Sequence, residues 1–373
     1  MKPSHLTPVE FEKLILALVR SFDEVWAPKA NKDGAVQYSR IQRAQDLPIG
    51  FQDEQTPGRY RLSASGAKSY FGYVVGPQSA KEFLFPPREA LLRMKKSKGK
   101  GVAIQEFPDF EKKKIALIGL RGCDIAAMGI LDRVFLGQRH QDPTYKARRK
   151  NLFVVGVNCT HSVSTCFCTS MGTGPRIQSG ADLILTEVLA GEKHFFVAET
   201  STDKGKHFLE KLEISVAASA EIGLATSKIE KTAERVSQNR GLNPIGIKEF
   251  LYQNITHSNW DQIAERCLAC GNCTAVCPTC FCSSVEDVTD LQGKETDRVR
   301  KWDSCFTSEH SYIHGGSVHQ SISSRYRQWM THKLASWHDQ FGSSGCTGCG
   351  RCVTWCPVGI DIREEIGKMR EEI

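Results

Sequence analysis

Two cysteine runs in the last third of the chain repeat one spacing. Cys267-x2-Cys270-x2-Cys273-x3-Cys277-Pro278 is followed, after a long insert, by Cys346-x2-Cys349-x2-Cys352-x3-Cys356-Pro357. Three closely spaced thiolates wrap three irons of a 4Fe-4S cubane, and the fourth cysteine of such a run reaches the other cluster in two-cluster proteins. We therefore predict two 4Fe-4S clusters, with the following ligands: Cys267, Cys270, Cys273 and Cys356 for cluster one; Cys346, Cys349, Cys352 and Cys277 for cluster two.

Zinc is the competing metal for these thiols. Structural zinc sites pair two Cys-x2-Cys units or add histidine, and they need neither a third cysteine two residues on nor a Cys-Pro after it. Gly271 and Gly350 lie inside the two ligand loops, where the backbone must pass close to a cluster. The pattern therefore favours iron–sulfur clusters.

Four more cysteines follow two predicted strands in the first half of the chain. Cys123 comes after the apolar run 114–120, and Cys159, Cys166 and Cys168 come after the run 152–157. If these strands are parallel neighbours, their carboxyl ends form the crevice where open α/β sheets bind ligands. We expect a third iron–sulfur cluster there; scattered buried thiols and a zinc site are the alternatives.

Three cysteines remain: Cys280, Cys282 and Cys305. The stretch Thr279-Cys-Phe-Cys-Ser283 nearly repeats Thr165-Cys-Phe-Cys-Thr169. These thiols could pack beside cluster one, could be alternative ligands to Cys277, or could belong to another metal or redox site completed by a histidine such as His310 or His314. Packing beside cluster one is slightly favoured.

The elements that position the first-half cysteines form a β-α-β pattern. The runs 114–120 and 152–157 are nearly continuous in apolar residues, as in strands buried on both faces, and helical spacing lies between them. Apolar runs at 183–185 and 195–197 could extend the sheet. Near the start, Thr7, Pro8 and Glu10 predict the N-terminus of a packing helix.

The whole chain is expected to form two domains. Residues 1–250 predict an α/β domain with a partly parallel sheet, and residues 258–373 predict a mainly α-helical, ferredoxin-like domain with two clusters. The insert between the two cysteine runs carries an aromatic stripe near helical spacing, which favours helices over the compact two-hairpin ferredoxin.

Composition excludes several classes of protein. The chain has 373 residues, of which 15 are cysteine, and a formal net charge of +7 from 49 basic and 42 acidic residues. The first residues contain no apolar signal core, so we expect a soluble, cytoplasmic protein without a membrane partner. In that reducing compartment a cysteine cluster indicates metal binding or redox chemistry. The basic stretch 95–114 has no recognised nucleic-acid motif, so we expect no nucleic-acid partner.

Nucleotide-binding motifs are also absent from the sequence. No G-x-G-x-x-G follows a predicted strand, and no phosphate-binding G-x-x-x-x-G-K-[ST] occurs. Flavin or nicotinamide binding by this chain therefore has no sequence support, and no catalytic residue is predicted. Each histidine is interpreted as a surface or core residue.

Several short motifs together resemble one family. They are Leu120-Arg-Gly-Cys-Asp124, Val157-Asn-Cys-Thr160, Thr165-Cys-Phe-Cys-Thr-Ser-Met-Gly-Thr-Gly-Pro175, Cys277-Pro-Thr-Cys-Phe-Cys282, Trp302-Asp-Ser-Cys305 and Cys349-Gly-Arg-Cys-Val-Thr-Trp-Cys-Pro357, with Phe83-Leu-Phe-Pro-Pro-Arg88 in addition. The chain resembles the iron–sulfur β subunit of cytoplasmic NAD(P)-linked nickel–iron hydrogenases, the sulfhydrogenases. It also resembles the iron–sulfur subunit of anaerobic sulfite reductase, a close relative.

The resemblance implies an electron-transfer subunit of a multisubunit oxidoreductase, without substrate chemistry of its own. In such assemblies a flavoprotein subunit exchanges hydride with NAD(P)H, while a separate catalytic subunit reduces protons or sulfite. A cluster-based redox sensor and a stand-alone sulfur reductase are the alternatives. The paired cluster motif favours the relay, because a sensor needs one labile cluster.

Overall fold

A mixed seven-stranded sheet forms the N-terminal part of the computed structural model, which describes residues 2–74, 76–97, 101–106, 113–137 and 139–372. The strand order is β1-β11-β10-β9-β8-β2-β3, and the four central strands, from β10 to β2, are parallel. The strands are β1 (Ser4–Leu6), β2 (Glu24–Ala30), β3 (Val36–Arg40), β8 (Ile115–Leu120), β9 (Leu152–Val157), β10 (Leu183–Ala190) and β11 (Lys193–Thr200).

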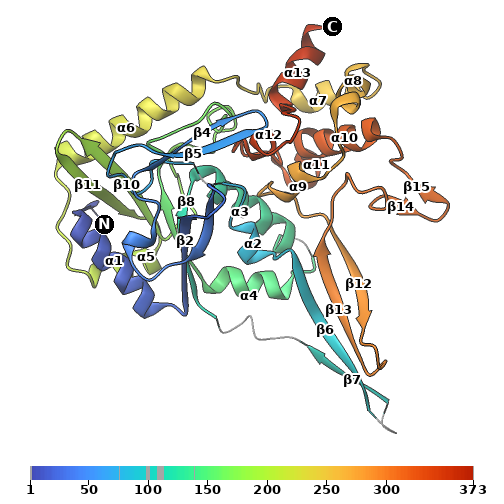
Figure 1. Cartoon of the computed structure of the whole chain (residues 1–373), viewed down its shortest axis with the longest axis horizontal. Coiled ribbons are helices and arrows are strands. Elements are labelled where there is room, and N and C mark those ends of the chain that lie inside the picture. The colour runs from blue at the N-terminus through green and yellow to red at the C-terminus, as the bar shows by residue number, and fades with distance from the viewer. Residues whose placement is uncertain (1, 75, 98–100, 107–112, 138, 373) are drawn as a thin grey trace.

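Helices cover both faces of this sheet (Figure 1). Successive residues of β9 point to opposite faces: Val155 packs in the core of α1, and Val154 packs in the core of α3. α1 (Pro8–Ser21) and α5 (Asp203–Glu210) lie on one face; α2 (Lys81–Leu84), α3 (Gly122–Phe135) and α4 (Pro143–Asn151) lie on the other. The long α6 (Ser219–Gln238) packs along β10 and β11.

Local signals that the sequence carries are confirmed in this part. The Thr7 hydroxyl accepts a hydrogen bond from the Glu10 amide at 3.2 Å, and the Glu10 carboxylate accepts one from the Thr7 amide at 2.8 Å, which makes a capping box for α1. β8 and β9 are parallel neighbours, as expected. The apolar runs at 183–185 and 195–197 do extend the sheet, as β10 and β11. The short α4, which enters β9, was not anticipated.

Short helices surround the two cysteine repeats in the C-terminal part. Their core contains Trp260 of α8, Trp329 and Met330 of α10, and Ile366 of α13, all buried. The helices are α7 (Ile247–Gln253), α8 (Asn259–Arg266), α9 (Asn272–Ala275), α10 (Ile322–Thr331), α11 (Trp337–Phe341), α12 (Arg351–Thr354) and α13 (Ile362–Glu371), with a π-helical turn at His332–Ser336 between α10 and α11.

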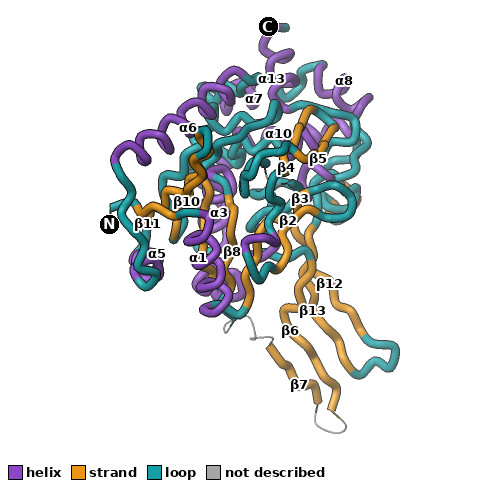
Figure 2. Tube along the Cα trace, turned by 60° about the vertical axis from the view of Figure 1, so that its left-hand side comes forward, coloured by secondary structure: helices purple, strands orange, loops and turns teal. Residues whose placement is uncertain are grey.

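The expectation of a mainly helical C-terminal domain is not confirmed, because a long hairpin interrupts it. β12 (Ser283–Thr289) and β13 (Glu295–Trp302) join β6 (Arg88–Ser97) and β7 (Gly101–Glu106) in a four-stranded sheet of order β12-β13-β6-β7. Figures 1 and 2 show this sheet extending away from the body of the molecule. Both halves of the chain therefore build it.

The remaining elements are small. β4 (Phe51–Thr56) and β5 (Arg59–Ala64) form a hairpin whose first strand contacts α12, and β14 (Tyr312–Ile313) pairs with β15 (Gly316–Ser317); a 3-10 turn spans Ala44–Asp46. Of the basic stretch 95–114, residues 98–100 and 107–112 lie outside the described residues. Across the part of the chain that the structure describes, no helix has the length and apolar character to cross a membrane.

Candidate metal centres

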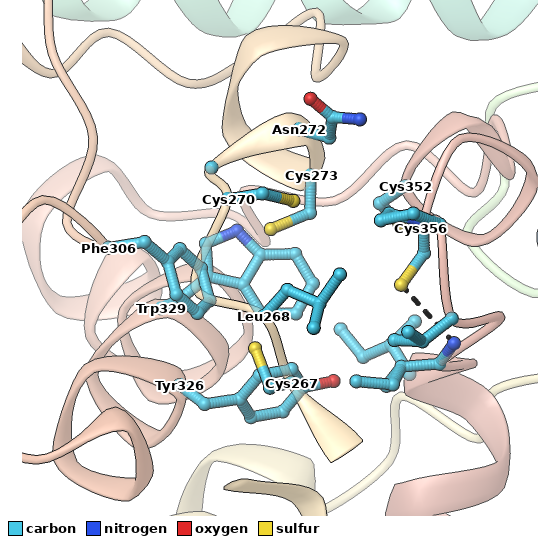
Figure 3. A pocket seen from close by; sticks show the side chains of 15 residues that line it. Cys267, Leu268, Cys270, Asn272, Cys273, Phe306, Tyr326, Trp329, Cys352 and Cys356 are labelled. Carbon is cyan, nitrogen blue, oxygen red and sulfur yellow. Dashed lines mark hydrogen bonds between the residues drawn. The ribbon is translucent and has the colours of Figure 1, made fainter.

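The thiols expected to hold cluster one line a single apolar cavity (Figure 3). Cys267 ends α8, Cys270 and Cys273 follow in the loop and in α9, and Cys356 comes from the second repeat. Aromatic and aliphatic side chains complete the wall: Leu268, Phe306, Tyr326, Trp329, Val358, Ile360 and Ile362. The four thiols thus line one largely apolar cavity, which Cys352 of the second repeat also lines, and Cys270 among them is exposed.

Backbone amides point at the first thiol of each repeat and at the last thiol of the second. Ala269 N–H lies 3.4 Å from Cys267 Sγ, and Gly348 N–H lies 3.4 Å from Cys346 Sγ at the equivalent place of the second repeat. Ile360 N–H lies 3.3 Å from Cys356 Sγ. Such N–H···S bonds hold a ligand sulfur in place and tune the reduction potential of a cluster.

The thiols group across the two repeats. Burial raises the pKa of Cys273, and the thiols of Cys267 and Cys356 raise it further. In the second repeat, burial raises the pKa of Cys352, and the thiols of Cys346, Cys349 and Cys277 add to that shift. Cys277 also acts on Cys273, and Cys273 also acts on Cys352, so the thiols of the two repeats lie close to one another.

A buried cation, Lys333, contacts Cys277, a thiol predicted to hold cluster two. Lys333, only 4% exposed, places Nζ 3.2 Å from Cys277 Sγ and 3.5 Å from Cys280 Sγ. Burial alone would lower the pKa of Lys333, but the charges of Cys277 and Cys280 outweigh burial and raise it well above its ordinary value. A buried ammonium beside thiolates compensates negative charge. The residues present therefore fit an anionic cluster with four thiolate ligands.

The four N-terminal cysteines gather at the carboxyl edge of β8 and β9. Cys123 opens α3, Cys159 follows β9, and Cys166 and Cys168 lie in the next loop. Burial raises the pKa of the Cys168 thiol, and the thiols of Cys159 and Cys166 add to the shift. The guanidinium of the buried Arg121 acts in the other direction at Cys159, where it partly offsets the effect of burial on the pKa.

This N-terminal group lies against the second repeat. Arg351, the first residue of α12, forms a buried ion pair with Asp124 of α3 at 2.8 Å. The Cys349 thiol is close enough to raise the pKa of Cys123, after burial and Asp124. A Cβ at Gly350 would lie 2.3 Å from the carbonyl oxygen of Thr165, so the two loops pack backbone to backbone. The predicted ligands of the third cluster and those of cluster two are thus neighbours.

Sequence reasoning did not anticipate the buried cations. Arg121 and Arg351 stand two residues from Cys123 and one from Cys352, so their place inside the motifs was an available signal. Lys333 and Lys81 carry no such signal, because both are far from any cysteine in the sequence. Lys81 Nζ lies 3.1 Å from the carbonyl oxygen of Ala275 and 3.7 Å from the centre of the Trp302 ring.

The three unassigned cysteines, Cys280, Cys282 and Cys305, line one cavity. Cys282 precedes β12 and Cys305 follows β13, at the same end of the hairpin. Both line a cavity that Cys280 and Lys333 also line, and Cys280 contacts Lys333 directly. Among the described residues, no three His, Cys, Asp or Glu side chains converge in the way that a single metal ion requires.

Comparisons with known proteins agree with the cysteine pattern. A model of the 4Fe-4S dicluster domain family matches residues 266–360. Sulfhydrogenase 2 subunit beta of Pyrococcus furiosus is 32% identical to this chain over 293 residues, which cover 78% of this chain and 82% of the relative. No solved structure matches.

Proposed function

The chain belongs to the family of iron–sulfur β subunits of sulfhydrogenases, and on this premise we propose that it relays electrons from a reductase partner that binds flavin and NAD(P) to a nickel–iron catalytic module, or in the reverse direction. It carries a 4Fe-4S dicluster domain, and electron transfer is the work of such a domain. The proposal includes the cysteine ligands of each cluster, the flavin-binding and nickel–iron partner subunits, and a location in the cytoplasm.

The observation that carries the proposal is the continuity of the three thiol groups. The N-terminal thiol group, which contains Cys123, has Cys349 of the proposed cluster two as a neighbour. Cys352 of the proposed cluster two in turn has Cys273 of the proposed cluster one as a neighbour. When bound, each cluster would take up and give up one electron. The chain's own residues hold the sulfur atoms, exclude water through aromatic walls, and balance negative charge with Lys333, Arg351 and Arg121.

The proposed ligands of the two C-terminal clusters are the exchanged sets predicted above. The electrostatic neighbours of these thiols support the assignment. Cys267 and Cys356 both act on the pKa of Cys273, and Cys277 acts on the pKa of Cys346 and of Cys352. A third cluster on Cys123, Cys159, Cys166 and Cys168 is also proposed, supported by their common place at the sheet edge and by the buried Arg121 beside Cys159.

Iron and sulfide analysis of the full chain tests the third cluster. Because each cubane holds four irons, Cys123→Ser is expected to lower iron from about twelve to about eight atoms per chain. Thr169→Ser, in the same loop, is the matched control and should leave the iron content unchanged. An unchanged iron content in Cys123→Ser, with wild-type circular dichroism, would contradict the third cluster.

Purification of the tagged chain from its native host tests the relay itself. The proposal expects a flavoprotein and a nickel–iron protein to co-purify, together with soluble, cytoplasmic fractionation. A sirohaem protein in their place would favour anaerobic sulfite reductase, and a chain found alone or on DNA would favour the sensor. Reduction of sulfur or sulfite by the isolated chain with an artificial electron donor would contradict a role without substrate chemistry.

A further inference from the structure

A groove lies between the two halves of the chain, next to a predicted cluster ligand. It has a volume of about 430 Å³. Its walls are α3 with the neighbouring α4, the loop at residues 171–180, and the segment 343–346, which leads into the second cysteine repeat. Among the described residues, Cys346 is the only cysteine that lines this groove, and it is partly buried. The groove therefore reaches a residue that we assign to cluster two.

The charged side chains that line the groove are mainly basic. Arg133 comes from α3, Arg149 from α4 and Arg176 from the loop. The acidic residue of the lining is Asp132, whose carboxylate pairs with Arg149 at 3.1 Å. Arg176 also has a distant acidic neighbour, Glu199, at 3.9 Å. Three arginines against one aspartate give the lining a net charge of +2.

The surface beside the groove is basic as well. Residues 131–150 contain six Lys or Arg and two Asp or Glu. Asp142, the second acid of this segment, is paired with Arg300. Within the part of the chain that the structure describes, no acidic side chain pairs with Lys146 or Lys150 of α4, and both are exposed. An excess of positive charge on one face attracts an acidic partner and speeds its encounter.

We propose that this groove docks a small acidic electron-carrier protein of the ferredoxin type, which exchanges electrons with the relay at the centre that Cys346 would hold. The proposal rests on the proposed relay and adds a further point of entry to it. One electron passes from the reduced carrier to that centre, so the carrier is oxidised and the centre is reduced. No bond is formed or broken, and no proton is transferred.

The groove reaches the middle of the series of thiol groups. Cys349, in the same repeat as Cys346, is a neighbour of Cys123 in the N-terminal group. Cys352, also in that repeat, is a neighbour of Cys273 of the proposed cluster one. A carrier docked beside Cys346 would therefore pass electrons in either direction along the chain. The two subunit partners of the relay need only its ends, which leaves this contact for a separate partner.

The hydrogen bonds of the arginines favour a protein over a small anion. The Arg133 guanidinium donates to Ser343 Oγ at 2.6 Å, and the Arg176 guanidinium donates to Thr226 Oγ1 at 3.2 Å. Arg149 is held by its aspartate. A small phosphate or carboxylate would have to break these bonds to gain bidentate contacts. An acidic protein surface instead interacts with the net charge of the groove and leaves the bonds in place.

Substitution of Gly129 tests the groove without disturbing the fold. Gly129 is exposed on α3 and lines the groove, and a Cβ built there would have no atom within 4 Å. A longer side chain is accepted at such a position, and it improves the helix propensity. Gly129→Glu, Gly129→Gln and Gly129→Lys therefore bring a negative, a neutral and a positive group of similar length to the same place.

The probe is a small acidic 4Fe-4S ferredoxin, added to the chain as purified without oxygen from its host, with the subunits that accompany it. Biolayer interferometry at low ionic strength measures the affinity. We expect Gly129→Glu to bind about fivefold more weakly than Gly129→Gln, and Gly129→Lys to bind at least as tightly as Gly129→Gln. Equal affinities of the three variants, or no binding by wild type, would overturn the proposal and leave the relay and its co-purifying subunits untouched.

A control variant and a competing ligand make the test specific. Gly367→Glu makes the same change at a second helical glycine with open space, in α13, which Figure 1 shows far from α4; it should bind as wild type. A short DNA duplex should bind more weakly than the ferredoxin. Equal binding of the duplex would show attraction to polyanions in general and would overturn the proposal.

Hydrogen–deuterium exchange and rapid mixing identify the contact and the electron transfer. Binding of the oxidised ferredoxin should slow exchange at residues 122–135 and 171–180. Protection of these residues before the ferredoxin is added would mean that a permanent subunit covers the groove, against the proposal. Mixing with reduced ferredoxin should bleach the cluster absorbance of the chain, faster in Gly129→Lys than in Gly129→Glu. Binding without this bleaching would overturn the assignment of the partner as an electron carrier.

Discussion

Charge compensation at single residues explains the basic surplus of this chain. An oxidised cubane with four thiolates carries a charge of about −2, so three of them would bring the formal +7 close to neutral. The sequence predicts only the total charge of the chain and its clusters, and it does not predict which basic residues lie beside the thiols. The structure locates part of it in Lys333, Arg351 and Arg121, each buried and each beside a thiol. No spacing rule could identify Lys333, because a turn far along the chain brings it to Cys277.

Replacing Lys333 is expected to change a reduction potential. Lys333→Met removes a positive charge 3.2 Å from Cys277 Sγ. Reduction adds an electron to the centre that this thiolate would hold, so loss of the cation disfavours the reduced state and lowers the potential. A redox titration followed by electron paramagnetic resonance measures the shift. Lys301→Met, an exposed lysine paired with Glu286, is the control and should leave the potentials unchanged. A potential that stays constant or rises in Lys333→Met, with iron content intact, would contradict the charge argument.

The reactivity of Cys282 is expected to depend weakly on pH. The hydrogen bond with Cys305, and then the hydrogen bond and charge of His310 and the charge of His332, lower the pKa of Cys282 to about 4, although burial opposes the shift. The thiolate therefore persists above that pH, and alkylation by iodoacetamide should proceed at a nearly constant rate from pH 8 down to about pH 5. An ordinary thiol, with a pKa near about 8.5, slows tenfold per pH unit over this range.

His310→Gln removes one of the groups that lower this pKa. The imidazole also carries a raised pKa of about 9, chiefly from its bond to Cys282 and, against burial, from Asp303. In the variant, alkylation of Cys282 is expected to slow as the pH falls, while the rate at high pH stays close to that of wild type. Peptide-resolved mass spectrometry follows the rate at Cys282 alone. A profile identical to that of wild type would show that His310 does not act on the thiol.

At the scale of elements, the sequence predicts what local patterns encode. Continuous apolar runs identify β8 and β9, and the Thr7 and Glu10 pair identifies the start of α1. The four-stranded sheet could not be predicted in this way, because β12 is largely exposed and β13 pairs with β6, which lies far away in the sequence. The place of Cys282 and Cys305 depends on that hairpin, so their proximity could not be predicted from spacing either.

The two ligand loops adopt the same backbone path with one difference in residue type. Ala269 has φ +49°, and Gly348, at the equivalent position of the second repeat, has φ +67°. The left-handed region costs alanine about 1 kcal/mol relative to glycine. Ala269→Gly is therefore expected to leave the free energy of unfolding unchanged or to raise it by up to about 1 kcal/mol, as measured by urea denaturation.

Gly348→Ala, the reciprocal change, is expected to destabilise the protein. Its Cβ would lie 2.5 Å from the carbonyl oxygen of Phe167 and 2.7 Å from Cys168 Cα, so the two loops would have to separate. Strain of this kind costs about 1–3 kcal/mol in addition to the backbone term. Equal effects of the two substitutions would mean that the close packing of the loops does not contribute to stability.

On the scale of the whole molecule, the two predicted domains, residues 1–250 and 258–373, share a sheet and a close loop contact. The β6–β7 pair from the first part completes the sheet of β12 and β13 from the second, and Gly350 packs on Thr165. Cysteine spacing predicts which thiols belong to each centre, but it does not predict that the loop of the second repeat packs against the loop of Cys166 and Cys168. The relay proposal depends on this packing, since it holds the N-terminal thiols beside Cys349.

The ion pair between Asp124 and Arg351 is expected to couple the two parts on unfolding. Both side chains are buried, and Arg351 Nε also donates to the carbonyl oxygen of Gly76 at 3.0 Å. Removing one member of a buried pair leaves an uncompensated charge and costs about 3–5 kcal/mol. Arg351→Met should therefore lower the free energy of unfolding by that amount, whereas Lys248→Met, which removes an exposed pair with Asp339, should leave it nearly unchanged.

The double variant Asp124→Leu and Arg351→Met shows whether Arg351→Met destabilises the protein because it leaves Asp124 as an unpaired buried charge, or only because Arg351 loses its own contacts. Replacing both partners removes the isolated charge, so the double variant should be more stable than Arg351→Met alone. Urea denaturation followed by far-ultraviolet circular dichroism, and in parallel by the absorbance of bound clusters, gives both free energies. If the pair joins the two parts, the transitions seen by the two signals coincide in wild type and separate in Arg351→Met. Additive effects of the two substitutions with coincident transitions throughout would mean that the parts are held together elsewhere, at the sheet that β6 and β13 share.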